Sequence, residues 1–151
     1  MSKRKQIEMN DAEVAQFLGE RHTMSVATNG RDGYPHLVAM WYGFLDGKPA
    51  FWTYARSQKT RNLERDNRIT CMIEDGTSYD TLRGVMLAGR ATIFRDAETV
   101  IKVGESVYER YNGPLTDETR PLVQYMGRKR VAVCIEVERV VSWDHRKLDG
   151  Y

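Results

Sequence analysis

Six stretches of this chain have the residue pattern of β-strands. In the first, Met24, Val26 and Thr28 alternate with Ser25 and Ala27, which is the period of a strand with one buried face. Turn sequences rich in glycine, asparagine and aspartate separate the first three stretches and predict tight hairpins between them. We expect strands at residues 23–28, 35–45, 50–54, 69–74, 85–94 and 130–141.

Capping residues predict where the helices begin. Asn10 and Glu13 have the spacing of a capping box, and the helix that they start should end near Gly19. The other expected helices are 57–66 with Ser57 as its cap, a long helix capped by Asp96 and ended by residues 112–114, and a short helix over 116–125 that Pro121 disturbs.

The order of these elements favours a mainly β protein. The first three strands follow one another without a helix, whereas parallel pairing would need a long crossover connection. Hairpins followed by inserted helices predict a small antiparallel β-barrel with helices packed on it. At 151 residues, without repeats or linker-like tracts, we expect one domain over residues 1–151.

Charge and composition exclude several classes of protein. The formal net charge is +2, which is too small for a general nucleic-acid binder. The polar start of the chain is not followed by an apolar segment, and no apolar run approaches membrane-spanning length. We therefore expect neither a secreted nor a membrane protein.

The cysteines and histidines indicate no metal or disulfide framework. Cys71 and Cys134 lie far apart in apolar stretches and suggest small core residues in a reducing cytoplasm. His22, His36 and His145 lack ligand spacing, so no metal site is expected. His36 could face a cleft, but a structural hydrogen bond is the better interpretation.

The stretch 51–70 carries the candidate chemistry. An aromatic strand around Trp52 leads into a helix whose first turns carry Lys59, Arg61 and Asn62. Free backbone amides beside fixed positive charge suit a phosphate, and the strand end could support a flat ring. The pattern indicates a site for a phosphate-bearing ring cofactor, although a solvated basic face would have the same composition. No catalytic side-chain constellation stands out.

Together these segments resemble the pyridoxamine 5′-phosphate oxidase-like split-barrel family, and within it the branch of coenzyme F420-dependent flavin/deazaflavin oxidoreductases. The segments that carry the likeness are 25–28, 32–37, 41–42, 51–53, 57–63, 82–85, 89–91 and 141–147. Ala39 and Asn67 stand where the family often has proline. The Arg- and Trp-bearing terminal segment of the true oxidase has no match, which argues against vitamin B6 oxidation.

The resemblance implies a Greek-key-like split barrel that forms a homodimer with a cofactor in each of two clefts between the protomers. It implies the following roles: Trp52 and Thr53 along the ring through their backbone, Lys59, Arg61 and Asn62 on the phosphate, Ser25 and Trp41 lining the cleft, and Trp143 closing over it from the partner. F420 carries a polyglutamate tail, for which Arg56, Arg65 and the run 128–130 are candidate contacts.

The function expected from this likeness is a cytoplasmic oxidoreductase that binds F420 and transfers hydride to an unsaturated small organic acceptor. One alternative is an FMN-dependent enzyme of the same fold. The other is a non-catalytic protein that binds flavin or haem, since the same barrel can hold a planar ligand without turnover.

Overall fold

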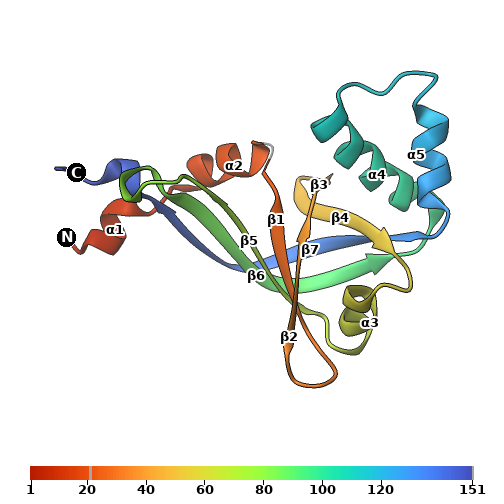
Figure 1. Ribbon diagram of the computed structural model, residues 1–151, viewed down its shortest axis with the longest axis horizontal. Helices are drawn as coiled ribbons and strands as arrows, with labels where there is room; N and C mark the ends of the chain where they lie inside the picture. Colours follow the sequence, from red (N-terminus) through yellow and green to blue (C-terminus); the bar gives the residue numbers. More distant parts are fainter. Residues whose placement is uncertain (21, 151) are drawn as a thin grey trace.

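One seven-stranded antiparallel sheet, strongly curled, forms the framework of the protein (Figure 1). The computed structural model describes residues 1–20 and 22–150. The order across the sheet is β2-β1-β5-β6-β7-β4-β3, and every pair is antiparallel. The strands are β1 (Met24–Asn29), β2 (Pro35–Met40), β3 (Gly43–Leu45), β4 (Lys48–Tyr54), β5 (Arg68–Asp75), β6 (Arg83–Phe94) and β7 (Arg130–Asp144). The predicted mainly β, antiparallel barrel with flanking helices is confirmed.

The expectation of one strand over residues 35–45 is wrong. The chain leaves the sheet at Trp41 and Tyr42, so β2 and β3 lie at opposite edges of the sheet. Tyr42 is fully buried and its hydroxyl donates to the carbonyl of Leu18 at 2.7 Å, which turns the backbone toward the neighbouring helix. This burial raises the pKa of Tyr42 to about 12. An alternating pattern alone cannot reveal a break that is fixed by a distant contact.

The helices largely follow their caps. They are α1 (Lys3–Ile7), α2 (Asp11–Gly19), α3 (Gln58–Arg65), α4 (Ala97–Asn112) and α5 (Arg120–Gly127), with short 3₁₀ turns at Tyr79–Thr81 and His145–Lys147. The capping box of Asn10 and Glu13 is present, and Ser57 and Asp96 cap α3 and α4. Pro121 does not disturb α5, because it lies in the first turn, where the missing N–H has no helical partner to lose. Helix α1 was not predicted. No helix in the described residues is long and apolar enough to cross a bilayer.

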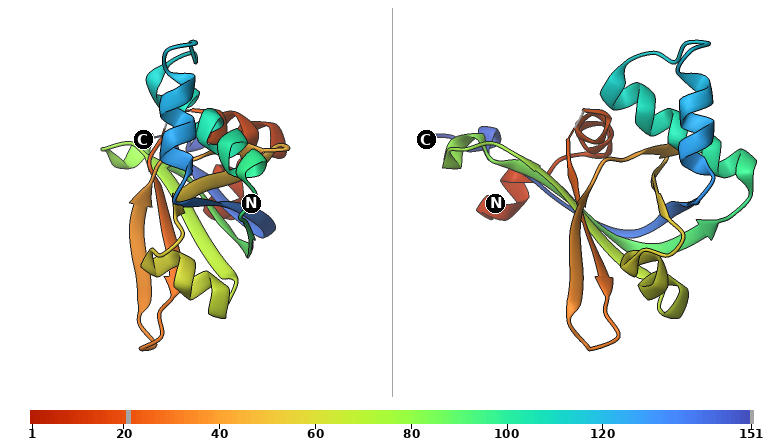
Figure 2. Two further views of the ribbon diagram at one scale, coloured as in Figure 1. Left: turned by 90° about the vertical axis from the view of Figure 1, so that its right-hand side faces the viewer. Right: turned by 45° about the vertical axis from the view of Figure 1, so that its right-hand side comes forward.

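Two apolar cores lie on the two sides of the sheet. The first fills the inside of the curl and includes Phe17, Val26 and Phe51. The second lies between β4, β7 and the pair α4–α5, which stands on the outside of the sheet (Figure 2). Gly104 of α4 packs directly on Trp52, because a Cβ there would lie 2.4 Å from the indole ring. The two cores fix β4 from both sides and hold its end in place for α3.

The long β6–β7 pair contains an irregularity at Gly89. The register between the two strands shifts between Ala88 and Gly89, which marks a β-bulge. A Cβ at Gly89 would lie 2.0 Å from the carbonyl oxygen of Glu136, so only glycine allows this close approach. Beyond the bulge the two strands continue as an arm toward the chain termini (Figure 1).

Candidate functional site

Helix α3 begins directly where β4 ends, and side chains lock the two together. The hydroxyl of Ser57 accepts a hydrogen bond from the backbone N–H of Thr60 at 3.3 Å. The buried hydroxyl of Thr60 donates to the carbonyl of Tyr54 at 3.0 Å. The start of α3 therefore has a fixed position relative to the last residues of β4.

Lys59 is the most unusual residue of this region, because it is a buried cation with one neutral partner. Its side chain is 8% exposed, and its Nζ donates to the hydroxyl of Thr53 at 2.9 Å. Among the residues that the structure describes, no carboxylate lies at ion-pair distance from it. Burial lowers the pKa of Lys59, because the ammonium loses hydration without gaining an opposite charge. The spare donors of this ammonium suit an anion such as a phosphate.

Asn62 lies beside Lys59 on α3, but most of its hydrogen-bonding capacity is already used within the fold. Its Nδ2 donates to the hydroxyl of Thr28 at 3.1 Å, and its Oδ1 accepts from Gln58 at 2.8 Å and from Arg65 at 3.3 Å. The side chain is completely buried. In this conformation Asn62 pins α3 to β1.

Arg61 lies on the exposed side of α3. Its guanidinium is 3.2 Å from the carboxylate of Glu64, with more than half of the arginine side chain exposed. It lines an open groove of about 960 Å³ between α3 and the β1–β2 hairpin. Lys59 and Arg61 thus face different surroundings on the same short helix.

Trp52 and Trp41, two of the aromatic residues predicted for the site, lie in different places. The indole of Trp52 is packed in the second core, under Arg130, whose guanidinium lies 4.9 Å from the ring. Only the backbone of Trp52 is therefore available at the strand surface. Trp41 stacks on Tyr111 at 4.5 Å, at the end of β2 away from the hairpin.

Ser25 and Trp143 lie on the face of the sheet opposite the first core. Directly opposed residues of neighbouring strands share a face. The registers join Ser25 to Met72, and Met72 to Met86, while the indole of Trp143 covers Gly84 two positions along the same face. Within one chain these two residues do not converge with Lys59, which contacts the inner-facing Thr53.

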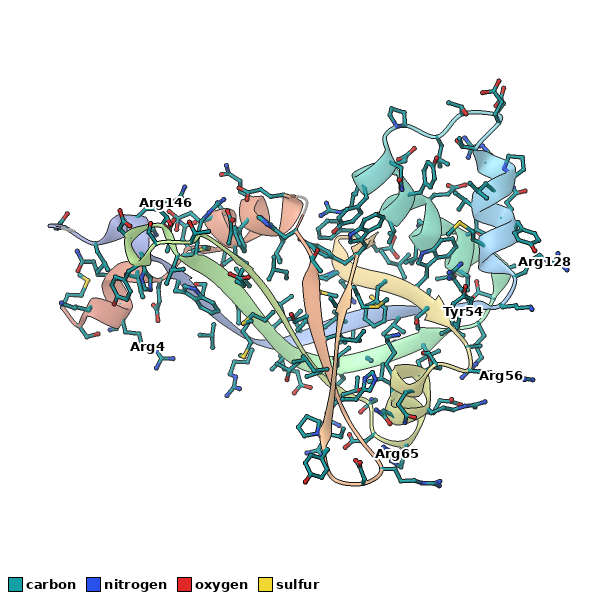
Figure 3. All side chains as sticks on the ribbon, in the orientation of Figure 1. Arg4, Tyr54, Arg56, Arg65, Arg128 and Arg146 are labelled. Atoms are coloured by element: carbon teal, nitrogen blue, oxygen red, sulfur yellow. The ribbon has the colours of Figure 1, made fainter. Side chains whose placement is uncertain are left out.

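The basic residues proposed for an anionic tail divide into two groups (Figure 3). Arg130 stacks between Trp52 and Tyr54, with its guanidinium 4.4 Å from the Tyr54 ring, and Arg128 lies over Tyr125 at 5.5 Å. Arg65 instead lies at the other end of α3. The two groups therefore flank α3 at opposite ends.

His36 was missed as a site residue, and the structural hydrogen bond expected for it is wrong. Its Nδ1 is the one buried side-chain nitrogen or oxygen without a hydrogen-bond partner among the described residues. It lines the groove beside α3 and lies opposite Thr28 in the β1–β2 register. Its place just after the hairpin turn was the only sequence signal for a cleft residue.

A second cluster of ionisable groups lies near the end of α2. Carboxylate and ring atoms of Glu20, His22 and Asp75 approach within 4.8 Å of one another, a spacing that could hold a metal ion. Arg83 pairs with both carboxylates, at 3.0 and 2.8 Å. These ion pairs lower the pKa of Asp75, where the hydrogen bond from Arg83 is the leading cause. The arginine already supplies the positive charge of this cluster.

Comparisons with known proteins agree with this architecture. The chain is 30% identical over 129 residues to the F420H(2)-dependent biliverdin reductase of Mycobacterium tuberculosis (strain CDC 1551 / Oshkosh), covering 83% of this chain and 82% of that protein. The crystal structure of the conserved hypothetical protein Rv2991 from Mycobacterium tuberculosis is 49% identical, with a TM-score of 0.94 over 100% of this chain and 94% of that one.

A more distant structure shares the fold alone. HutZ, the haem storage protein from Vibrio cholerae, is 18% identical with a TM-score of 0.68, covering 87% of this chain and 94% of that one. Residues 11–144 also match the family described as pyridoxamine 5′-phosphate oxidase. The match spans both the curled sheet and α3, and the chain therefore belongs to the pyridoxamine 5′-phosphate oxidase family of split barrels.

Proposed function

We propose that this protein is a homodimeric oxidoreductase that binds coenzyme F420 and reduces an unsaturated small organic acceptor by hydride transfer. The observation that carries the proposal is Lys59, a buried ammonium whose one partner in the described residues is a neutral hydroxyl. A bound phosphate group would give this charge the partner that the fold alone does not. The 30% identity to an F420H(2)-dependent reductase supports F420 as the bearer of that phosphate.

The residues around Lys59 fit such a group. Lys59 would bind the phosphate, Thr53 would orient its ammonium, and Arg61 would approach from the exposed side of α3. The backbone of Trp52 and Thr53 would lie along the ring. The bound deazaflavin supplies the hydride, while the protein orients the ring and excludes water. Asn62 contributes by holding α3 in position.

The outer face of the sheet supports a homodimer. Across five strands, one row on this face consists of Ala39, Ser25, Met72, Met86 and Val141. Met72 is 38% exposed, and Leu37, which lies in the next row of the same face on β2, is 68% exposed. Such an apolar surface is typical of a protein interface. In the dimer Ser25 would line the cleft, and Trp143 would reach the cofactor of the partner. Trp41 would lie at the edge of the cleft.

The test is a fluorescence titration of the purified, cofactor-free protein with F420 and, separately, with FMN. We expect F420 to bind more tightly, and Lys59→Met to weaken it at least tenfold, because a charge-assisted hydrogen bond contributes about 1.5–3 kcal/mol. Lys48→Met is the matched control, since Lys48 is half exposed and pairs with Glu136. Equal F420 affinity in wild type and Lys59→Met would remove the site assignment.

Ligand binding by the same purified protein distinguishes two alternative functions. Preference for FMN would make it a flavin-dependent reductase that uses the same lysine. Binding of haem without turnover would place it with carriers such as the haem storage protein that shares its fold. We propose a reducing cytoplasm as its setting, in keeping with the two free, buried cysteines.

A further inference from the structure

A second groove lies on the outside of the sheet, between the first turns of α4 and the last turn of α5 (Figure 2). Its volume is about 700 Å³, which is within the range of small-molecule sites. The indole of Trp52 packs in the core beneath it, whereas Thr53 and Lys59 lie on the other side of β4. Among the described residues, none that lines this groove belongs to α3. The groove is therefore separate from the site around Lys59.

The floor of the groove is apolar and shallow. Val100, which is buried, and Ile101, which is half-buried, form it together with Gly127 of α5. A Cβ at Gly127 would lie 2.6 Å from Cδ1 of Ile101, so the glycine lets this side chain lie directly against α5. Ala97 continues the apolar wall at the start of α4. A floor made of short side chains and glycine backbone suits a flat apolar body such as an aromatic ring.

The rim of the groove carries four basic side chains and two glutamates. Three of these charges have partners outside the groove, at 3.3, 3.3 and 3.1 Å, in the pairs Arg95–Glu64, Lys102–Asp46 and Glu105–Arg120. In the part of the chain that the structure describes, Glu98, Arg128 and Arg130 have no ion-pair partner. Glu98 lies in the first turn of α4, where the helix dipole favours its charge. The unpaired groups leave an excess of one positive charge, which fits a monoanion.

Arg128 and Arg130 are held by aromatic rings rather than by carboxylates. The guanidinium of Arg130 lies 4.4 Å from the ring of Tyr54, and its Nη1 donates to the carbonyl of Met126 at 2.9 Å. The guanidinium of Arg128 lies 5.5 Å from the ring of Tyr125. Contacts of this kind hold a guanidinium in place without using its N–H groups. Both arginines therefore keep donors for a ligand.

We propose that this groove is a second small-molecule site, which binds an aromatic monocarboxylate with its ring on Ile101 and Gly127 and its carboxylate on Arg128 and Arg130. Guanidinium groups match the planar carboxylate with paired hydrogen bonds. The apolar floor gives the ring a surface to cover, which an inorganic anion cannot use. This ligand is independent of the cofactor proposed for Lys59.

The experiment is a calorimetric titration of the full-length protein with 2-naphthoate, with its neutral amide and with acetate. We expect the acid to bind about fivefold more tightly than the amide, which has the same rings without the charge. Acetate, which lacks the rings, should give no measurable heat. Equal binding of the acid and the amide would overturn the proposal.

Two variants test the two ends of the ligand. Arg128→Ala should weaken the acid about fivefold and leave the amide unchanged, because only the carboxylate uses the guanidinium. Ala97→Leu enlarges an exposed side chain of the groove wall and keeps every charge, so both naphthalene ligands should bind about fivefold more weakly. Arg4→Ala is the matched control, an exposed arginine at the opposite end of the molecule (Figure 3).

Three results would overturn the proposal. Equal weakening of the acid by Arg4→Ala and Arg128→Ala would mean that it follows general surface charge. Unchanged binding in both Arg128→Ala and Ala97→Leu would place it elsewhere on the protein. In Lys59→Met we expect the acid to bind within about twofold of wild type, because the two sites are separate. A loss there equal to that in Arg128→Ala would move the acid to the phosphate site.

Discussion

Two partly or fully buried cations, Arg110 and Lys59, show opposite ways of placing a charge inside this protein. Arg110 donates to the carbonyls of Tyr42 at 2.9 Å and Glu20 at 3.0 Å, with longer bonds to the carbonyls at 18 and 19. Its guanidinium also lies 4.7 Å from the Tyr42 ring. Lys59 has one hydroxyl. A cation that serves the fold has its donors satisfied by the fold, whereas Lys59 keeps donors in reserve for a ligand.

The largest effect should come from removing the saturated cation. Arg110→Met removes the guanidinium donors from the carbonyl of Tyr42 and from the carbonyls at the end of α2, of which that of Leu18 keeps only the Tyr42 hydroxyl, and we expect the free energy of unfolding to fall by about 3 kcal/mol. Urea denaturation measures the loss. Arg90→Met is the control, since Arg90 forms an exposed pair with Glu138 and should change stability by less than about 0.5 kcal/mol. A loss of less than 1 kcal/mol in Arg110→Met would contradict the comparison.

A smaller loss of stability is expected for Asn62, which allows a comparison of two residues, Asn62 and Lys59, on the same helix α3. Asn62→Ala removes the bond to Thr28 and leaves a buried hydroxyl without its donor, so we expect a loss of about 2 kcal/mol. The affinity for F420 should fall less than in Lys59→Met when both are measured well below their unfolding temperatures. The reverse order would make Asn62 a ligand for the cofactor.

The smallest change in stability, and one of opposite sign, is expected for Lys59→Met. Replacing a desolvated, unpaired ammonium with an apolar side chain should leave stability unchanged or raise it by about 1 kcal/mol at pH 7. The pKa of Lys59 is lowered in the folded state, so unfolding takes up a proton between this lowered pKa and the ordinary value. Wild type therefore gains stability relative to Lys59→Met as the pH rises through that window. A clear loss of stability at pH 7 would show that Lys59 serves the fold.

Local signals were enough to predict most of the elements and the candidate lysine. The caps at Asn10, Ser57 and Asp96 depend on residues within one turn, and each was predicted from the sequence. The break at Tyr42 depends on the carbonyl of Leu18, 24 positions away, and no periodic pattern contains it.

The candidate site, too, could be predicted only in part from local sequence. The residue types around Lys59 predicted an anion site, but burial without a carboxylate is a tertiary property. The structural role of Asn62 depends on its bond to Thr28, and the unpaired nitrogen of His36 depends on how the hairpin packs. These roles come from contacts between segments that the sequence does not place together.

The two-residue link between β2 and β3 has a consequence for the whole sheet. These strands are its two outermost members, yet Met40 and Gly43 are separated by only three peptide steps, which span at most about 11 Å. The link therefore holds the two edge strands close together at one end of the curled sheet. The opposite end of β2 begins at Pro35 beside α3, where the chain makes no such short connection between the two edge strands.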